Sequence, residues 1–140
     1  MKSAIVLAPL LALVAAVPQK RQDYPDCGTT TGDLYVPETI IPGEKFSARF
    51  CSSTYAKTSS RSITFAISAK GDTEINSAVI LADELTTDDG KKYDFEATLP
   101  TGQIQFPEKT NFIVVEKIND YYVDSSYAVH TKEVKVDSTA

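Results

Sequence analysis

Few residues of this chain have the types and spacing that catalysis requires. His130 is the single histidine, and no Gly-x-Ser-x-Gly segment accompanies it. Acids occur as two adjacent pairs, Asp83-Glu84 and Asp88-Asp89. Catalysis by two carboxylates needs both held in fixed roles beside a substrate, whereas these pairs fall between predicted strands, where acids are well solvated. We therefore expect no catalytic residues, an exposed histidine on a late edge strand, and a protein that is not an enzyme.

The same four acids have a second interpretation as a calcium loop. They lie within residues 83–89, and calcium favours several oxygen ligands on irregular backbone. They lack the alternating Asp-x-Asp-x-Asp order of known calcium loops. Zinc is disfavoured by the single histidine and by cysteines that we expect to be paired. We predict no metal and no cofactor, with calcium at this loop as the open alternative.

The segment that most resembles a binding surface is rich in tyrosine. It contains Tyr121, Tyr122 and Tyr127 together with Asp120 and Asp124, between the last two predicted strands. Loops at the tip of a sandwich often carry recognition, and tyrosine rings with carboxylates suit sugars or protein surfaces. The simpler expectation is that one or two of the tyrosines fold back to cap the core.

Two cysteines, Cys27 and Cys51, are the only ones in the chain. In an oxidising compartment two lone cysteines pair, and closing a loop of this size is worth about 3 kcal/mol. Cys51 is in phase with Lys45, Ser47 and Arg49, which predicts an outward position. The bridge is therefore expected to clip the amino-terminal arm to the end of a strand.

The first 16 residues are typical of a secretory signal peptide. Lys2 is followed by an apolar run from Ala4 to Val14 and by small residues up to Ala16. The run is shorter than the roughly 20 residues that span a bilayer. We expect cleavage after Ala16 and a secreted, extracellular product.

Residues 17–21 then form a short propeptide that ends in the dibasic pair Lys20-Arg21, which resembles the sites of kexin-type processing proteases. The mature chain, residues 22–140, is expected to be one domain with a flexible amino-terminal arm. It would carry 11 basic and 19 acidic residues, a net charge of −8. Such a surface argues against nucleic acid and anionic membranes as partners. The polar carboxyl terminus argues against a lipid anchor.

From Leu34 onward hydrophobic residues recur with period two, the signature of half-buried strands. The expected strands include 45–51, 62–68 and 92–99, a weaker strand from Ile75 to Leu81, and a short segment at 34–36. Their inward residues are Phe46, Ala48, Phe50, Ile63, Phe65, Ile67, Tyr93, Phe95, Ala97 and Leu99.

The strand at 111–118 is apolar on both faces, which predicts a central position in its sheet. In the last strand Tyr127 and Val129 are out of phase with Val134 and Val136, and a bulge near Thr131 would reconcile them. About seven antiparallel strands between proline–glycine turns predict an all-β, immunoglobulin-like Greek-key sandwich with one disulfide. A small closed barrel is the alternative.

Two longer segments carry a family resemblance. Residues 36–46, VPETIIPGEKF, and 49–63, RFCSSTYAKTSSRSI, resemble a group of small secreted fungal proteins without assigned activity. The proline–glycine turn before a strand is more loosely similar to the immunoglobulin-like domain of fungal cell-wall proteins linked to β-1,6-glucan assembly. The resemblance implies the fold and assigns no functional residue.

Function is therefore expected to be binding. The leading hypothesis is a secreted, non-catalytic interaction module at the cell wall or toward a host, with cell-wall polysaccharide or an extracellular protein as partner. A polysaccharide-active enzyme and a purely structural wall protein are the alternatives.

Overall fold

The structure is a computed structural model that describes residues 23–28, 32–52, 58–102 and 104–139. The predicted signal peptide and propeptide, residues 1–21, lie outside the described residues. So do residues 53–57.

The described residues form eight strands and one short 3-10 helix. In chain order these are β1 (Leu34–Tyr35), β2 (Thr39–Ile40), β3 (Lys45–Cys51), β4 (Thr58–Ser68), the helix η1 (Ile75–Ser77), β5 (Ala78–Leu85), β6 (Lys92–Thr98), β7 (Lys109–Asp120) and β8 (Ser126–Val136). The all-β prediction is confirmed.

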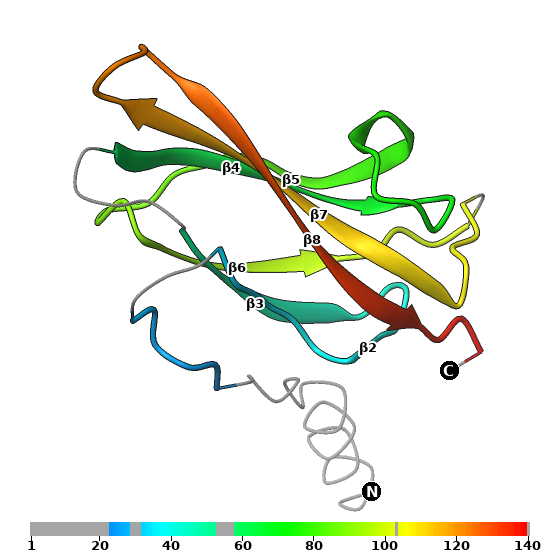
Figure 1. Ribbon diagram of the computed structural model, residues 1–140. Coiled ribbons are helices and arrows are strands. Elements are labelled where there is room, and N and C mark those ends of the chain that lie inside the picture. Colours follow the sequence, from blue (N-terminus) through cyan, green and yellow to red (C-terminus); the bar gives the residue numbers. More distant parts are fainter. Residues whose placement is uncertain (1–22, 29–31, 53–57, 103, 140) are drawn as a thin grey trace, which may run out of the picture.

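The strands build two separate sheets that face one another as a sandwich (Figure 1). The smaller sheet has the order β1-β3-β6, and the larger has the order β2-β8-β7-β4-β5. Neighbours pair antiparallel except β2, which runs parallel to β8. The chain crosses from the smaller to the larger sheet between β1 and β2, so β1 belongs to the smaller sheet and β2 to the larger.

Phenylalanine rings fill the space between the sheets. Phe65 and Phe112, both fully buried, stack with ring centroids 4.7 Å apart. Phe46 comes from the other sheet and packs on Phe112 at 5.6 Å. Each such ring removed from water stabilises the fold by about 2 kcal/mol. The inward residues expected for β3, β4 and β6 all lie in this core or pack against it.

β7 is the central strand of the larger sheet, as its sequence predicts. Phe112 and Val114 face the core. Ile113 has the opposite phase and is also fully buried, on the outer face of the sheet. A strand with neighbours on both sides and buried apolar residues on both faces is well fixed in register. This matters because β7 leads into the tyrosine segment.

The weaker strand predicted at Ile75–Leu81 is placed wrongly. Residues 75–77 form the helix, and the strand runs from Ala78 to Leu85. The hydroxyl groups of Ser68 and Ser77 donate to the carboxylate of Asp72, at 2.8 and 3.0 Å, and close a turn that delays the strand. Asp83 and Glu84 consequently lie on a strand and not in the loop where the sequence placed them.

The bulge predicted near Thr131 does not form. β8 pairs with β7 without interruption from Ser126 opposite Ile118 to Lys135 opposite Lys109. Tyr127 and Val129 simply face outward, and the inward phase at that level is taken by His130. A polar side chain fits there because it finds a buried partner, so the strand has no need to change phase.

Candidate functional site

The tyrosine segment forms the tip of a hairpin. β7 ends at Asp120 and β8 begins at Ser126, and the connection between them stands clear of the body of the sandwich (Figure 1). The carboxylate of Asp120 accepts a hydrogen bond from the backbone N–H of Tyr122 at 2.9 Å, which fixes the start of the turn. The Tyr121 and Tyr122 rings meet edge to face, with centroids 5.2 Å apart.

None of the three tyrosines folds back over the core, so the simpler expectation is wrong. Tyr121 is 77% exposed, Tyr122 73% and Tyr127 68%. Val123 and Val129 add further exposed apolar surface on the same hairpin. The hairpin extends the paired strands beyond the other layer, and the core is already closed below it by phenylalanines.

The two acids of the segment differ in what they can do. Asp120 is half-buried, and its carboxylate already accepts the bond that shapes the turn. Asp124 is exposed at the end of the connection. The structure therefore brings all five predicted contact residues to one hairpin, with Asp120 positioning the turn and the others on its surface.

His130 is not the exposed histidine that the sequence predicts. Its side chain is only 17% exposed, and its Nε2 lies 3.2 Å from Oε1 of Glu116, which is completely buried. The imidazole also packs on the ring of Phe50 at 5.0 Å. A Cβ on Gly32 would lie 2.5 Å from the imidazole, so only a glycine allows this close approach.

Glu116 is a buried carboxylate with several donors. The hydroxyl of Ser52 donates to its other oxygen at 2.5 Å, and the Ser60 and Tyr93 hydroxyl groups bond one another at 2.6 Å nearby. Burial raises the pKa of Glu116, but the hydrogen bonds from His130, Ser52 and Ser60 outweigh it and leave the pKa below its ordinary value of 4.5. The carboxylate is therefore ionised, and His130 is the donor to it.

This cluster has the residue types of a hydrolytic triad in an unsuitable order. In a triad the imidazole lies between the hydroxyl and the carboxylate, so that it can remove the hydroxyl proton. Here the carboxylate of Glu116 lies between Ser52 and His130. The arrangement holds the two sheets together through a satisfied polar network, and it does not activate Ser52.

The sequence contains a signal for the burial of Glu116. Glu116 has the same phase on its strand as Phe112 and Val114, which face the core. A charged residue on the core face of a strand requires buried partners. Its partners come from three distant segments, so the pairing itself could not be read from the chain.

The disulfide between Cys27 and Cys51 is confirmed, with a sequence separation of 24 and a Cα–Cα distance of 5.4 Å. It ties the amino-terminal arm to the end of β3, as expected. Cys51 has the outward phase that the sequence predicts, but it is buried because the arm covers this face of β3.

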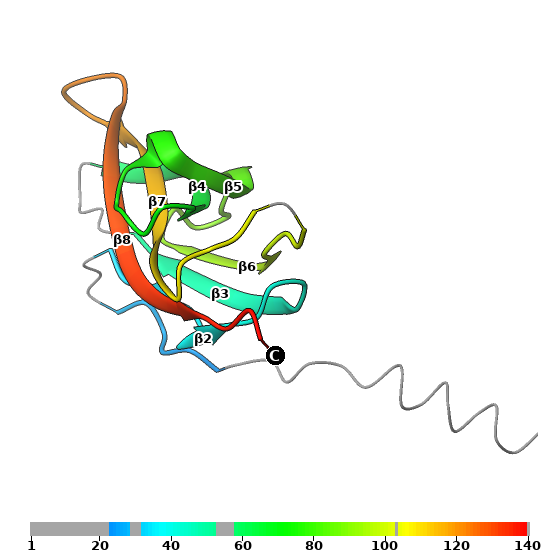
Figure 2. The same ribbon diagram turned by 90° about the vertical axis from the view of Figure 1, so that its right-hand side faces the viewer.

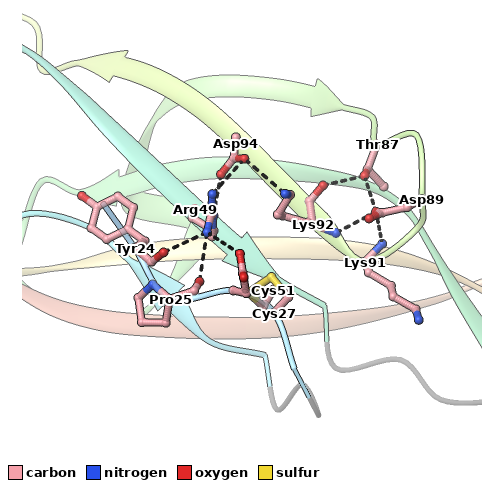
Figure 3. A network of polar contacts seen from close by, with 11 residues as sticks. Tyr24, Pro25, Cys27, Arg49, Cys51, Thr87, Asp89, Lys91, Lys92 and Asp94 are labelled. Atoms are coloured by element: carbon pink, nitrogen blue, oxygen red, sulfur yellow. Dashed lines mark hydrogen bonds and ion pairs between the residues drawn. A yellow bond between two sulfur atoms is a disulfide. The ribbon is translucent and has the colours of Figure 1, made fainter. Parts of the chain in front are cut away.

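Arg49 holds the same arm from the neighbouring outward position of β3 (Figure 3). Its guanidinium donates to both carboxylate oxygens of Asp94, at 2.7 and 3.2 Å, and to the carbonyls of Tyr24 and Pro25 at 3.0 Å. A planar group with five donors is suited to this role. The arm from Asp23 to Gly28 is thus fixed by one covalent and several polar contacts.

The arm also forms a concavity that the sequence did not predict. Tyr24 stacks on Tyr35 at 5.9 Å, and its hydroxyl donates to the carbonyl of Ser47. Burial raises the pKa of Tyr24. The two rings and the edge of β8 near Lys132–Lys135 line an open concavity of about 810 Å³.

The acids of residues 83–89 are mostly used in local structure. Asp83 accepts a bond from the hydroxyl of Thr64 at 2.7 Å. Asp89 accepts bonds from the backbone N–H groups of Lys91 and Lys92, which lower its pKa. Within the described part of the chain, no group of three histidine, cysteine or acidic residues is placed to hold a metal ion.

These features define the chain as a disulfide-clipped β-sandwich with an exposed aromatic hairpin. No family model matches it, and no curated protein matches its sequence. Among solved structures, the immunoglobulin-like domain of murine CRIg is similar, with a TM-score of 0.44, 6% identity, and coverage of 77% of this chain and 99% of that one. The resemblance to secreted fungal proteins stays a prediction. The described residues include no helix long and apolar enough to span a membrane.

Proposed function

We propose that this protein is a secreted, non-catalytic interaction module of immunoglobulin-like Greek-key build, acting at the fungal cell wall or toward a host. It binds its partner through the tip of the β7–β8 hairpin. The contact residues are Tyr121, Tyr122, Tyr127, Asp120 and Asp124. The disulfide supports export, because such bonds persist in oxidising compartments.

The observation that carries the proposal is the exposure of three tyrosines on one hairpin. All three lie between 68% and 77% exposed, and they contribute little to the core. Tyrosine provides a large, flat contact area at low entropic cost because it has only two side-chain torsions. Apolar surface concentrated at a projecting tip is typical of an interaction site.

The chemistry of the tip favours a partner that offers hydroxyl groups next to an apolar face. Sugar rings have this character, since their C–H faces stack on tyrosine while their hydroxyl groups bond to carboxylates. Asp124 is exposed beside the rings and supplies such an acceptor. Cell-wall polysaccharide is therefore the first partner to test, and an extracellular protein is the second.

The test is a pull-down of protein recovered from the medium of a secreting host, against insoluble glucan, chitin and cellulose. Binding to at least one polymer is expected, and it should fall at least tenfold, about 1.4 kcal/mol, in the double variant Tyr121→Ala/Tyr122→Ala. The matched control is Ile75→Ala/Ile80→Ala, which removes two exposed apolar side chains elsewhere and should bind normally.

Binding that survives loss of both tyrosines would reject the hairpin as the contact surface. Absence of binding to every polymer and to extracellular proteins would favour a purely structural role. Release of reducing sugar by the pure protein, abolished by a single acidic substitution, would show an enzyme instead.

A further inference from the structure

Among the described residues, no strand pairs with the outer side of β8 next to the hairpin. The pairing of β8 with β2 covers only Lys135 and Val136. In the described residues no other strand pairs with this side of β8, so the segment Ser126–His130 lies at the border of the larger sheet. Figure 2 shows β8 at the outer margin of the sandwich.

The direction of the backbone groups along this edge follows from the hydrogen bonds at the carboxyl-terminal end of β8. The N–H groups of Lys135 and Asp137 donate away from β7, to Glu38 and Ile40. The N–H of Val136 donates to Glu108 on the opposite side. By alternation, Tyr127 and Val129 point their N–H and C=O groups outward from the sheet.

Other strand edges carry features that discourage pairing with another chain. β5 has two register shifts along β4, and Glu84 there has a φ of 51°. β6 presents the charged residues Lys92, Asp94 and Glu96. Irregularity and charge of this kind are the usual protection of exposed edges.

The edge from Ser126 to His130 has neither feature. Its sequence, SYAVH, contains no proline or acid, and its register with β7 is continuous. Tyrosine and valine favour strands, and both are more than half exposed here. A regular, unprotected edge of this length is a template for one more strand.

We propose that this edge pairs with the same segment of a second copy of the chain. The two β8 strands run antiparallel about a twofold axis at Ala128, which joins the two larger sheets into one. Tyr127 then lies opposite Val129 of the second copy, an aromatic–β-branched pair that stabilises antiparallel strands. Ser126 lies opposite His130 of the second copy.

The charges on either side of the paired segment favour this register, and they favour a second copy of the chain as the partner. With Ala128 at the axis, Asp124 of each copy lies opposite Lys132 of the other, so that two opposite-charge pairs flank the strand. In this register the paired strands comprise residues 126–130 of each copy. The segment 35–39 lies farther along β8, beside Lys132–Lys135.

The inference does not depend on the proposed binding function. Self-association uses the backbone of β8 and shares Asp124 and Tyr127 with the proposed contact surface, while Tyr121 and Tyr122 stay outside the paired segment. The double tyrosine variant should therefore lose partner binding and keep the dimer.

Sedimentation of the secreted protein at increasing concentration tests the proposal. We expect a monomer–dimer equilibrium. The single variants Asp124→Lys and Lys132→Asp should each raise the dissociation constant about tenfold, because each turns two attractive pairs into repulsive ones. The combined variant Asp124→Lys/Lys132→Asp restores both pairs and should return the constant to that of the parent.

A protein that stays monomeric up to about 1 mM would overturn the proposal. So would a dimer that both single variants leave unchanged, or single variants that the combination fails to rescue. Val129→Pro provides a second measurement, because it removes an outward N–H without breaking a bond to β7. It should abolish the dimer while circular dichroism stays that of a β protein, and a dimer that survives in the folded variant contradicts strand pairing.

Discussion

At the scale of single residues, Glu116 determines how the two sheets meet near the hairpin. Its carboxylate is fully buried and accepts bonds from Ser52, at the end of β3, and from His130 on β8. A buried charge is tolerated only when its hydrogen-bonding capacity is satisfied. The same bonds orient the imidazole and leave Tyr127 and Val129 in the outward phase.

Replacement Glu116→Gln should lower the free energy of unfolding by about 1–3 kcal/mol at neutral pH, because the charged hydrogen bonds are lost. Urea denaturation measures this change. The exposed control Glu96→Gln breaks only a surface ion pair with Lys45 and should cost about 1 kcal/mol or less. Equal losses in the two variants would mean that the buried network contributes nothing special.

The contribution of the Glu116 carboxylate to stability should depend on pH. The pKa of Glu116 is below 4.5 in the folded protein, so its stabilisation is fully present above pH 4.5 and is lost as the pH falls through the folded value. The stability gap between the parent and Glu116→Gln should therefore narrow in acid. A gap that stays constant down to about pH 2 would contradict the assigned pKa direction.

Residue roles were only partly predictable from the sequence. Cys27 and Cys51 could be paired because they are the only two, and the tyrosine segment could be located by composition. The surroundings of His130 could not be predicted. Gly32 and Phe50, which pack against its imidazole, are far away in the chain, and their approach follows from the packing of the two sheets.

At the scale of elements, the amino-terminal arm behaves as part of the sandwich. The disulfide and the bonds from Arg49 hold it across the outer face of β3, and Cys51 is buried as a result. Strand phase predicted the direction of Cys51 correctly, but burial depended on what covers the face.

Replacement Cys27→Ser should lower the melting temperature by an amount that corresponds to about 3 kcal/mol. Calorimetry measures the shift, and far-UV circular dichroism should remain that of a β protein, since the core does not include the bridge. The double variant Cys27→Ser/Cys51→Ser separates loss of the bridge from the effect of a free buried thiol. An unchanged melting temperature would mean that the bridge does not stabilise the fold.

Period-two patterns located β3, β4, β6 and β7 well, because each has one strongly apolar face. They failed where local side-chain bonds compete with the strand, as at Asp72 before β5. They also failed in β8, because His130, paired with the buried Glu116, lies at an inward position where the pattern predicts an apolar residue.

At the scale of the whole molecule, two neighbouring features of one hairpin have different proposed roles and share Asp124 and Tyr127. The tip presents the tyrosine rings, and the edge of β8 presents backbone groups. A dimer through the edge would carry two tips on one continuous sheet, and two linked sites bind a repeating polymer more tightly than one.

The central claim is that the tip of the hairpin is the surface that meets the partner. NMR titration of the labelled protein with a soluble fragment of the polymer that it binds tests this most directly. The largest shift changes should fall on the amides of residues 119–127. The account would be contradicted if the largest shift changes fell on the residues around the concavity of Tyr24 and Tyr35 while the hairpin amides did not shift.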